Sequence, residues 1–383
     1  EKAMIKEIGS YIYDETENGA VILECDKNIS GDVEIQESFF GVPVVGIAAF
    51  AFMKCKRMLG VQIPDSVTEI GRGAFYGCTE MRSAVLPANV RDISEWTFDS
   101  CTNLFGMVLP RGIVSIGSRA FGQCRSLSEI YLPDTVEYIA GDAFEDCICL
   151  ESVNVAKGNE HYINDQNVLF SADMTELVLC MSDDFVDDFA VPYTVRRIGE
   201  GAFCNWTELE RLELSDETEE IGARAFSGCK KLVEIEMYDG LTKIGARAFN
   251  ECVAIQEICL PGSIHSIGDE AFAYCLNLTD INLPGRIMKL SRGMFEGCTE
   301  LKKLSIPENI AAIEERAFNC CYKLSDITIP RGVKRIGENA FRRCFRLKNV
   351  RFDGTREEWN EVSVAPGNEC LLRTIKYSND GED

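Results

Sequence analysis

The sequence predicts an α/β repeat solenoid, in which short coils of chain stack around one continuous hydrophobic core. Three observations carry this prediction: a phenylalanine that returns every 23 residues, an isoleucine five residues before it, and a cysteine three residues after it. A solenoid grows by adding coils, so the 383 residues need not divide into globular domains. A hydrophobic share of 46% is enough for such a core, and no apolar run approaches the length of a membrane span.

The phenylalanine defines twelve repeat units, at Phe52, Phe75, Phe98, Phe121, Phe144, Phe203, Phe226, Phe249, Phe272, Phe295, Phe318 and Phe341. The residue five positions earlier is isoleucine in eleven units and Leu290 in the other, and alanine directly precedes the phenylalanine in ten. Equivalent side chains of stacked coils lie above one another, so these columns are expected to form the core.

Each unit is predicted to contain one strand and one helical turn. Leu127–Leu132 ends in the alternation of period two that is typical of a strand, and Pro133 ends the strand because proline has no N–H donor. The glycine after the isoleucine, as at Gly71 and Gly245, suits a tight corner with positive φ. The Ala-Phe segment is too short for a full helix, and we expect a helical or 3₁₀ turn opposite a single parallel β-sheet wall.

The unit resembles the BspA-like, bacterial surface antigen type of leucine-rich repeat, whose signature is a Leu/Ile strand, a proline, an Ile-Gly corner and Ala-Phe-x-x-Cys. The resemblance covers about residues 40–352. It departs from the general leucine-rich motif because the Asn or Cys after the last strand leucine is absent, and a cysteine instead precedes the first leucine, as Cys124 precedes Leu127. The resemblance implies a surface-exposed or secreted module that takes part in adhesion.

Breaks in the period give the expected divisions of the chain. These are an N-terminal β-hairpin cap (1–40), leucine-rich repeats (41–152), an irregular long coil or insertion (153–194), further repeats (195–352), a C-terminal cap (353–377) and a disordered tail (378–383). The hairpin is predicted because Ile8–Tyr13 and Ala20–Cys25 flank the turn signal Glu17-Asn18-Gly19. Thr355 and Glu358 have the spacing of a capping box that opens a short helix.

The long coil carries an acidic run, Asp183, Asp184, Asp187 and Asp188. This run lacks the 12-residue spacing and central glycine of an EF-hand calcium loop, so a solvated loop is the favoured interpretation.

The cysteines are predicted to form a ladder of small, buried, free thiols. Eleven of the twelve units place cysteine three residues after the phenylalanine, and Trp206 takes that position in the other. A 23-residue spacing is foreign to the closely spaced cysteine pairs of zinc sites. Equivalent Cβ atoms in stacked coils lie about 5 Å apart, whereas a disulfide needs about 3.8 Å.

Little in the sequence supports catalysis, and no cofactor is expected. The chain has two histidines, His161 and His265, and lacks both a Gly-rich phosphate loop after a strand and a Gly-x-Ser-x-Gly elbow. An enzyme would require an unrecognised site in the inserted coil.

The net charge of −23 disfavours nucleic acid and anionic membrane as partners. The charge is uneven, with a balance of −11 over Asp173–Glu220 and +7 over Arg331–Arg351. The two segments are either differently solvated faces, or the basic one is an end patch for an acidic partner or for weak self-association with another copy of the chain.

The candidate binding residues lie in the solvent-facing columns of the predicted strands. Five carboxylates, spaced about 4.8 Å apart on neighbouring strands, are Glu213, Glu234, Glu236, Glu257 and Asp280. An apolar strip on earlier coils contains Val85, Val108 and Tyr131. Either water and salt screen the carboxylates, or these side chains receive a cationic partner or a divalent ion, with the apolar strip as a second contact.

These observations leave three hypotheses of function. The first is a non-enzymatic interaction module at the bacterial surface or secreted, which binds a protein or glycan ligand through the solenoid wall. The second is an intracellular scaffold, and the third is an enzyme. The sequence begins with Glu1 and not with methionine, which indicates a trimmed or mature chain, so the missing signal peptide says nothing about the compartment. The resemblance implies an extracellular or cell-surface location, and the cytoplasm is the alternative.

Overall fold

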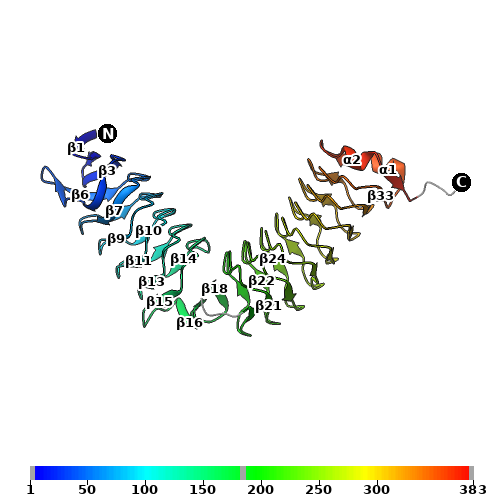
Figure 1. Cartoon of the computed structure of the whole chain (residues 1–383), viewed down its shortest axis with the longest axis horizontal. Coiled ribbons are helices and arrows are strands. Elements are labelled where there is room, and N and C mark those ends of the chain that lie inside the picture. The colour runs from blue at the N-terminus through cyan, green and yellow to red at the C-terminus, as the bar shows by residue number, and fades with distance from the viewer. Residues whose placement is uncertain (1–4, 182–186, 379–383) are drawn as a thin grey trace. The chain divides into compact units, whose positions relative to one another are not determined.

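The computed structural model describes residues 5–181 and 187–378, which belong to two compact units (Figure 1). Unit 1 comprises residues 1–174 and 178–183, and unit 2 comprises residues 175–177 and 184–383. Each unit is a β-solenoid in which every coil contributes a strand to each of two walls of parallel strands.

The first wall contains the strands predicted from the Leu-x-x-Ile-x-Leu pattern, and we call it the strand wall. In unit 1 its strands are β4 (Ser30–Glu34), β7 (Arg57–Gln62), β9 (Ser83–Val85), β11 (Gly106–Val108), β13 (Glu129–Leu132) and β15 (Ser152–Val155). In unit 2 they are β19 (Asp188–Ala190), β21 (Arg211–Glu213), β23 (Glu234–Glu236), β25 (Glu257–Ile258), β27 (Asp280–Ile281), β29 (Lys303–Ser305), β31 (Asp326–Ile329), β33 (Asn349–Phe352) and β35 (Ile375–Tyr377). Paired residues of neighbouring repeat coils are 23 apart, as Val108 and Tyr131 are.

A second wall, the corner wall, shows that the prediction of a single sheet was wrong. In unit 1 it contains β6 (Val42–Ile47), β8 (Glu69–Ile70), β10 (Asp92–Ile93), β12 (Ser115–Ile116) and β14 (Tyr138–Ile139). In unit 2 it contains β20 (Arg197–Ile198), β22 (Glu220–Ile221), β24 (Lys243–Ile244), β26 (Ser266–Ile267), β28 (Lys289–Leu290), β30 (Ala312–Ile313), β32 (Arg335–Ile336) and β34 (Ser363–Val364). Most of these strands have two residues, too few for an alternating pattern to be visible in the sequence.

The Ala-Phe segments form successive tight turns, so the predicted helical or 3₁₀ turns and the α/β class need correction. In the coil of Phe52, the Phe52 N–H donates to the carbonyl of Ala74 in the next coil, whereas the Cys55 N–H donates back to the Phe52 carbonyl. Lys54, between them, has a positive φ of 60°. Because alternate N–H groups bond to the next coil, a continuous helical hydrogen-bond ladder cannot form.

The glycine that follows the corner isoleucine is required for a different reason from the one predicted. Gly71 and Gly245 do not have positive φ; a Cβ on Gly71 would lie 2.5 Å from the Ala49 nitrogen, and one on Gly245 would lie 2.4 Å from the Ala223 nitrogen. The backbone of the preceding coil therefore fills the space that a side chain would need.

The repeated phenylalanines form a buried stack in each unit. Phe226 and Phe249 have ring centroids 5.3 Å apart with planes 6° apart, and Phe249 and Phe272 follow at 5.7 Å and 1°. All three rings are fully buried. These are offset-stacked aromatic contacts, so the phenylalanine column is part of the core as predicted.

The column cysteines lie beside the phenylalanine stack, and each thiol has a defined hydrogen bond. Cys252 Sγ donates to the Phe226 carbonyl at 3.1 Å and Cys275 Sγ donates to the Phe249 carbonyl at 3.2 Å. Both side chains are fully buried, and burial raises the pKa of Cys275 to about 12. The predicted ladder of buried thiols is confirmed for these positions.

Different structural elements cover the first coil and the last coil. At the N-terminus, β1 (Ile5–Ile8), β2 (Tyr11–Thr16) and β3 (Gly19–Cys25) pair in antiparallel order, and Tyr13 and Phe39 pack with centroids 4.9 Å apart. At the C-terminus the predicted capping box is present at the start of α1 (Arg356–Asn360), with Trp359 buried against Phe352.

Asn368, just before α2 (Glu369–Leu372), completes the C-terminal cap. The Phe341 N–H, which would otherwise donate to a further coil, donates to Asn368 Oδ1 at 3.0 Å. The Asn368 amide donates to the carbonyls of Gly337 and Ala365 at 3.0 and 2.7 Å. One buried side chain thus satisfies backbone groups that the end of the stack would leave unpaired.

The long coil between the repeats contains β16 (Tyr162–Asp165) and β17 (Val168–Ser171), which form an antiparallel pair, and β18 (Glu176–Cys180). Of the acidic run, Asp183 and Asp184 lie outside the described residues, whereas Asp188 begins β19. The tail beyond Ser378 also lies outside them. Over residues 5–181 and 187–378, no helix is both long and apolar enough to cross a membrane.

Truncating one ring of the stack should destabilise the fold strongly. Phe226→Ala should lower the free energy of unfolding by about 3–5 kcal/mol, because it removes a fully buried aromatic ring between two others. Lys231→Ala, which removes only an exposed ion pair with Glu208, should leave the denaturant midpoint nearly unchanged. Equal midpoint shifts in the two variants would contradict the buried stack.

The ladder thiols should resist alkylation while the protein is folded. The exposed Cys149 and Cys259 should react with iodoacetamide at pH 8, and Cys275 should not, because it is buried and its raised pKa keeps it protonated up to about pH 12. Peptide mapping by mass spectrometry after timed labelling measures this difference. In denaturant all eighteen cysteines should react, and recovery of only a few would contradict the free-thiol ladder.

Candidate binding surface

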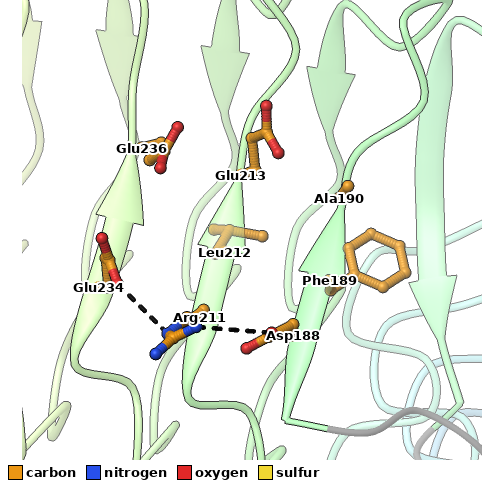
Figure 2. Close-up of a pocket in the computed structure, with 8 residues that line it drawn as sticks. All are labelled: Asp188, Phe189, Ala190, Arg211, Leu212, Glu213, Glu234 and Glu236. Atoms are coloured by element: carbon orange, nitrogen blue, oxygen red, sulfur yellow. Dashed lines mark ion pairs between the residues drawn. The ribbon is translucent and has the colours of Figure 1, made fainter.

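The strand wall of unit 2 begins with a shallow hollow over β19, β21 and β23, which we call the acidic hollow (Figure 2). Its volume is about 300 Å³, and its lining residues are Asp188, Phe189, Ala190, Arg211, Leu212, Glu213, Glu234 and Glu236. The strands alternate exposed and buried positions, so the charged side chains point outward and Leu212 lies buried beneath them. Four carboxylates surround one guanidinium, so the net charge of the hollow is negative.

Arg211 organises one side of the hollow. Its Nε lies 3.3 Å from Glu234 Oε2, and its Nη1 lies 3.8 Å from Asp188 Oδ2, on the strands that flank its own (Figure 2). Arg211 therefore reduces the repulsion between stacked carboxylates that the sequence suggested. All three side chains are more than half exposed, so these ion pairs are open to exchange with a competing cation.

Tyr238 links the carboxylates on the other side. Its hydroxyl lies 3.2 Å from Glu213 Oε1 and 3.1 Å from Glu236 Oε2. The hydrogen bond to Glu236, followed by desolvation and the hydrogen bond to Glu213, raises the pKa of Tyr238 to about 12. One feature of the sequence could have identified this residue, since most units have proline at the position of Tyr238.

The other two predicted carboxylates lie further along the same wall. Glu257 and Asp280 are paired in register on β25 and β27, and both are exposed. They do not line the hollow, which holds only Glu213, Glu234 and Glu236 of the five. The acidic column is therefore continuous along the wall, but its concave part is confined to the first three strands.

The predicted apolar strip lies on the strand wall of unit 1. Val85, Val108 and Tyr131 come from the adjacent strands β9, β11 and β13, and their exposed fractions are 57%, 76% and 44%. Three neighbouring apolar side chains with this much exposure form a patch on the surface.

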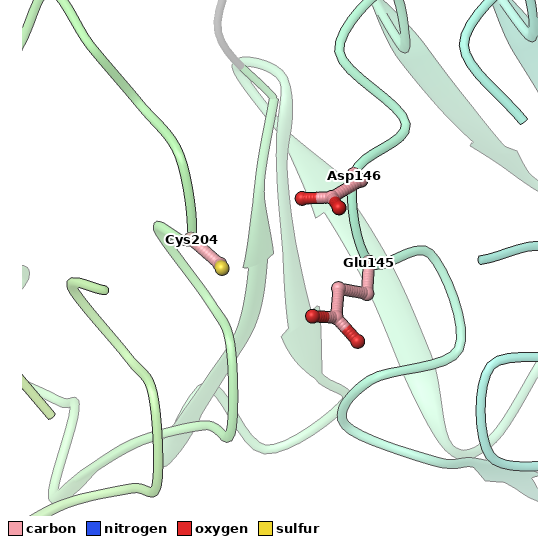
Figure 3. A group of neighbouring side chains, drawn as sticks. All are labelled: Glu145, Asp146 and Cys204. Atoms are coloured by element: carbon pink, nitrogen blue, oxygen red, sulfur yellow. The ribbon is translucent and has the colours of Figure 1, made fainter. Parts of the chain in front are cut away.

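No histidine lies in the acidic hollow or the apolar strip among the residues that the structure describes. His161 and His265 are exposed and lie outside the acidic hollow. Figure 3 draws Glu145, Asp146 and Cys204, whose side-chain types can bind a metal ion. Glu145 and Asp146 belong to unit 1 and Cys204 to unit 2, and Glu145 forms an ion pair with Arg119 of its own unit, so we assign no metal site to them.

The comparisons with known proteins agree with the repeat pattern. The BspA type leucine rich repeat region (6 copies) matches residues 45–171, 180–299 and 265–380. The crystal structure of a leucine rich cell surface protein from Faecalibacterium prausnitzii A2-165 is 26% identical, with a TM-score of 0.54 and coverage of 96% of this chain and 99% of that chain. A search of curated proteins gives no match.

Two other solved structures show the same fold at lower identity. A leucine-rich repeat protein from Eubacterium ventriosum ATCC 27560 is 22% identical, covering 100% of this chain and 97% of that chain with a TM-score of 0.64. The pneumococcal vaccine antigen PcpA is 20% identical, covering 99% and 98% with a TM-score of 0.60. In both cases the likeness extends over the whole stack of coils.

Tyr238 should ionise well above the ordinary tyrosine pKa of 10.0. Deprotonation would place a third negative charge beside Glu213 and Glu236, so its ionisation should have a midpoint near pH 12. The measurement is an ultraviolet titration of the wild type and of Tyr238→Phe, in which the difference between the two curves reports this one phenol. A difference curve centred near pH 10 would show that the hydroxyl does not bridge the carboxylates.

Proposed function

The chain belongs to the BspA-type leucine-rich repeat family, and we propose that it is a protein-interaction module displayed on a bacterial cell surface. Family membership and the likeness to a bacterial cell-surface protein support the location and the class of function. The acidic hollow is the observation that carries the proposal, because it is a concave, charged surface on rigid strands.

The chemistry of the hollow favours a basic protein segment as its partner. An arriving Lys or Arg side chain can replace the exposed guanidinium of Arg211 beside Asp188 or Glu234. The stem of that side chain can pack against the exposed Ala190. The carboxylates of Glu257 and Asp280 extend the same negative surface along the wall for further basic residues.

A non-enzymatic, adhesion-type role follows from this surface. The hollow offers ion pairs, and its lining residues include no histidine, cysteine or serine. The apolar strip of Val85, Val108 and Tyr131 is a second contact surface for the same kind of partner.

Neutralising the hollow should weaken binding of a basic peptide. The probe is a fluorescent synthetic peptide in which Lys and Arg alternate with apolar residues, and its affinity for the intact chain is measured by anisotropy. Glu234→Gln with Glu236→Gln should raise the Kd about tenfold, which corresponds to about 1.4 kcal/mol. The matched control is Glu80→Gln with Glu137→Gln, which removes the same charge at exposed positions outside the hollow.

The control separates recognition from general attraction to an acidic protein. If both double variants weaken the peptide equally, the hollow is not a binding site and the proposal fails. Surface display has its own test, the labelling of the protein on intact native cells with a membrane-impermeant biotin reagent. Absence of labelling on intact cells, with labelling after lysis, would contradict the cell-surface location.

A further inference from the structure

Ion pairs between successive coils neutralise many of the basic side chains in unit 2. Several of these pairs join residues 23 apart, so a cation in one coil meets a carboxylate in the coil above or below it. Examples, with their N–O distances, are Lys231 and Glu208 (2.5 Å), Lys243 and Glu220 (2.7 Å), Arg247 and Glu270 (2.6 Å), and Lys323 and Glu300 (2.6 Å). The register of the solenoid thus sets which charges are matched within the chain.

In the last 23-residue coil, Arg331 and Arg335 form ion pairs with Glu358 and Glu314, but four other cations do not. Arg342, Arg343, Arg346 and Lys348 are all exposed, and none of them forms an ion pair with any carboxylate of the described part of the chain. Arg343 points along the stack to Cys320, where its Nη1 lies 4.0 Å from the sulfur. The coil therefore presents four cations that the stack does not neutralise.

Two exposed aromatic rings lie among these cations. Tyr322 and Phe345 are stacked, with ring centroids 5.7 Å apart and planes 16° apart, and 77% of Phe345 is exposed. Exposed aromatic rings beside arginine are the residue types that contribute most to protein–protein binding. We call the surface of Tyr322, Arg342, Arg343, Phe345, Arg346 and Lys348 the basic edge.

We propose that the basic edge binds the acidic hollow of a second copy of this chain. The hollow presents Asp188, Glu213, Glu234 and Glu236, and the planar arginine groups of the edge match such carboxylates in charge and geometry. This inference rests on the proposed function, because it uses the same hollow and identifies one of its partners.

The pairing has to be between molecules. Phe203 and Phe341 mark the coils at the two ends of the repeat stack in unit 2 and are six repeats apart. At about 4.8 Å per coil the hollow and the edge are separated by roughly 29 Å along the stack, so one chain cannot bring them together. A contact between two different surfaces is heterologous, and it gives head-to-tail assemblies, which are either open chains or closed rings.

Two double variants, each of which replaces two charged side chains by neutral glutamine, test the inference. Arg343→Gln with Arg346→Gln neutralises two cations of the basic edge and leaves the acidic hollow intact. Glu234→Gln with Glu236→Gln neutralises two carboxylates of the hollow and leaves the edge intact. Sedimentation velocity of the full chain over a concentration series should show dimers and larger species for the wild type at an ionic strength of about 0.01 M. At about 1 M these should dissociate, because the Debye length falls from about 30 Å to about 3 Å.

The mixing experiment is the decisive arm. Each variant alone should be monomeric, whereas an equimolar mixture should give a one-to-one dimer that does not grow, since only one intact edge and one intact hollow can meet. The matched control, Arg111→Gln with Arg125→Gln, removes two exposed cations outside the edge and should assemble like the wild type. All the substituted side chains are exposed, and unchanged unfolding midpoints check that each variant folds.

Three results would overturn the inference. The wild type could stay monomeric at low ionic strength, the control could lose assembly as fully as the edge variant, or the mixture could remain monomeric. A monomeric chain whose edge binds an acidic protein or an anionic polysaccharide would also overturn it. In each case the basic-peptide measurement on the hollow stands separately, so failure of self-association is distinguishable from failure of the proposed function.

Discussion

The hydrogen bonds between successive repeat coils, whose strand residues pair 23 positions apart, are the constraint on which the rest of the structure depends. Backbone N–H groups of both walls and of the Ala-Phe turns donate hydrogen bonds to carbonyls of the neighbouring coil. Every repeat residue therefore lies over its equivalent, and one sequence column becomes one line in space. The phenylalanine stack, the thiol ladder and the close approach at Gly71 all follow from that alignment.

The columns that could be predicted from sequence are those whose residues have a single role. Phenylalanine, isoleucine and cysteine recur because each fills the same part of the core, so their burial was readable from the period alone. The corner wall was missed because strands such as Glu69–Ile70 are too short to show alternation. The sequence predicts positive φ at the corner glycines. In the coil of Phe249 the residues with positive φ are instead Arg247 and Glu251, and the N–H group of each donates a hydrogen bond to the next coil.

The candidate site was predictable to the same extent and for the same reason. The register placed Glu213, Glu234 and Glu236 together, and the structure agrees. Two features could not be read from columns: the bridge from Tyr238, and the contribution of Asp188 from the irregular coil. Each depends on the direction of a long side chain, or on how a non-periodic segment enters the wall, and a repeat pattern specifies neither.

The same register explains why the charged surfaces lie where they do. Inside a stack, a cation such as Lys243 has a carboxylate available in the neighbouring coil, so its charge is matched within the chain. A coil at the end of the stack has a repeat neighbour on only one side, and the cap that replaces the other, with Asn368 satisfying backbone groups, supplies no matching charge to Arg346 or Lys348. At the opposite end, Asp188 enters the wall on the first strand and adds a carboxylate beside Arg211, which already faces Glu234. The acidic hollow and the basic edge therefore lie at the two ends of the repeats of unit 2, and a partner can bind there without breaking a coil-to-coil contact.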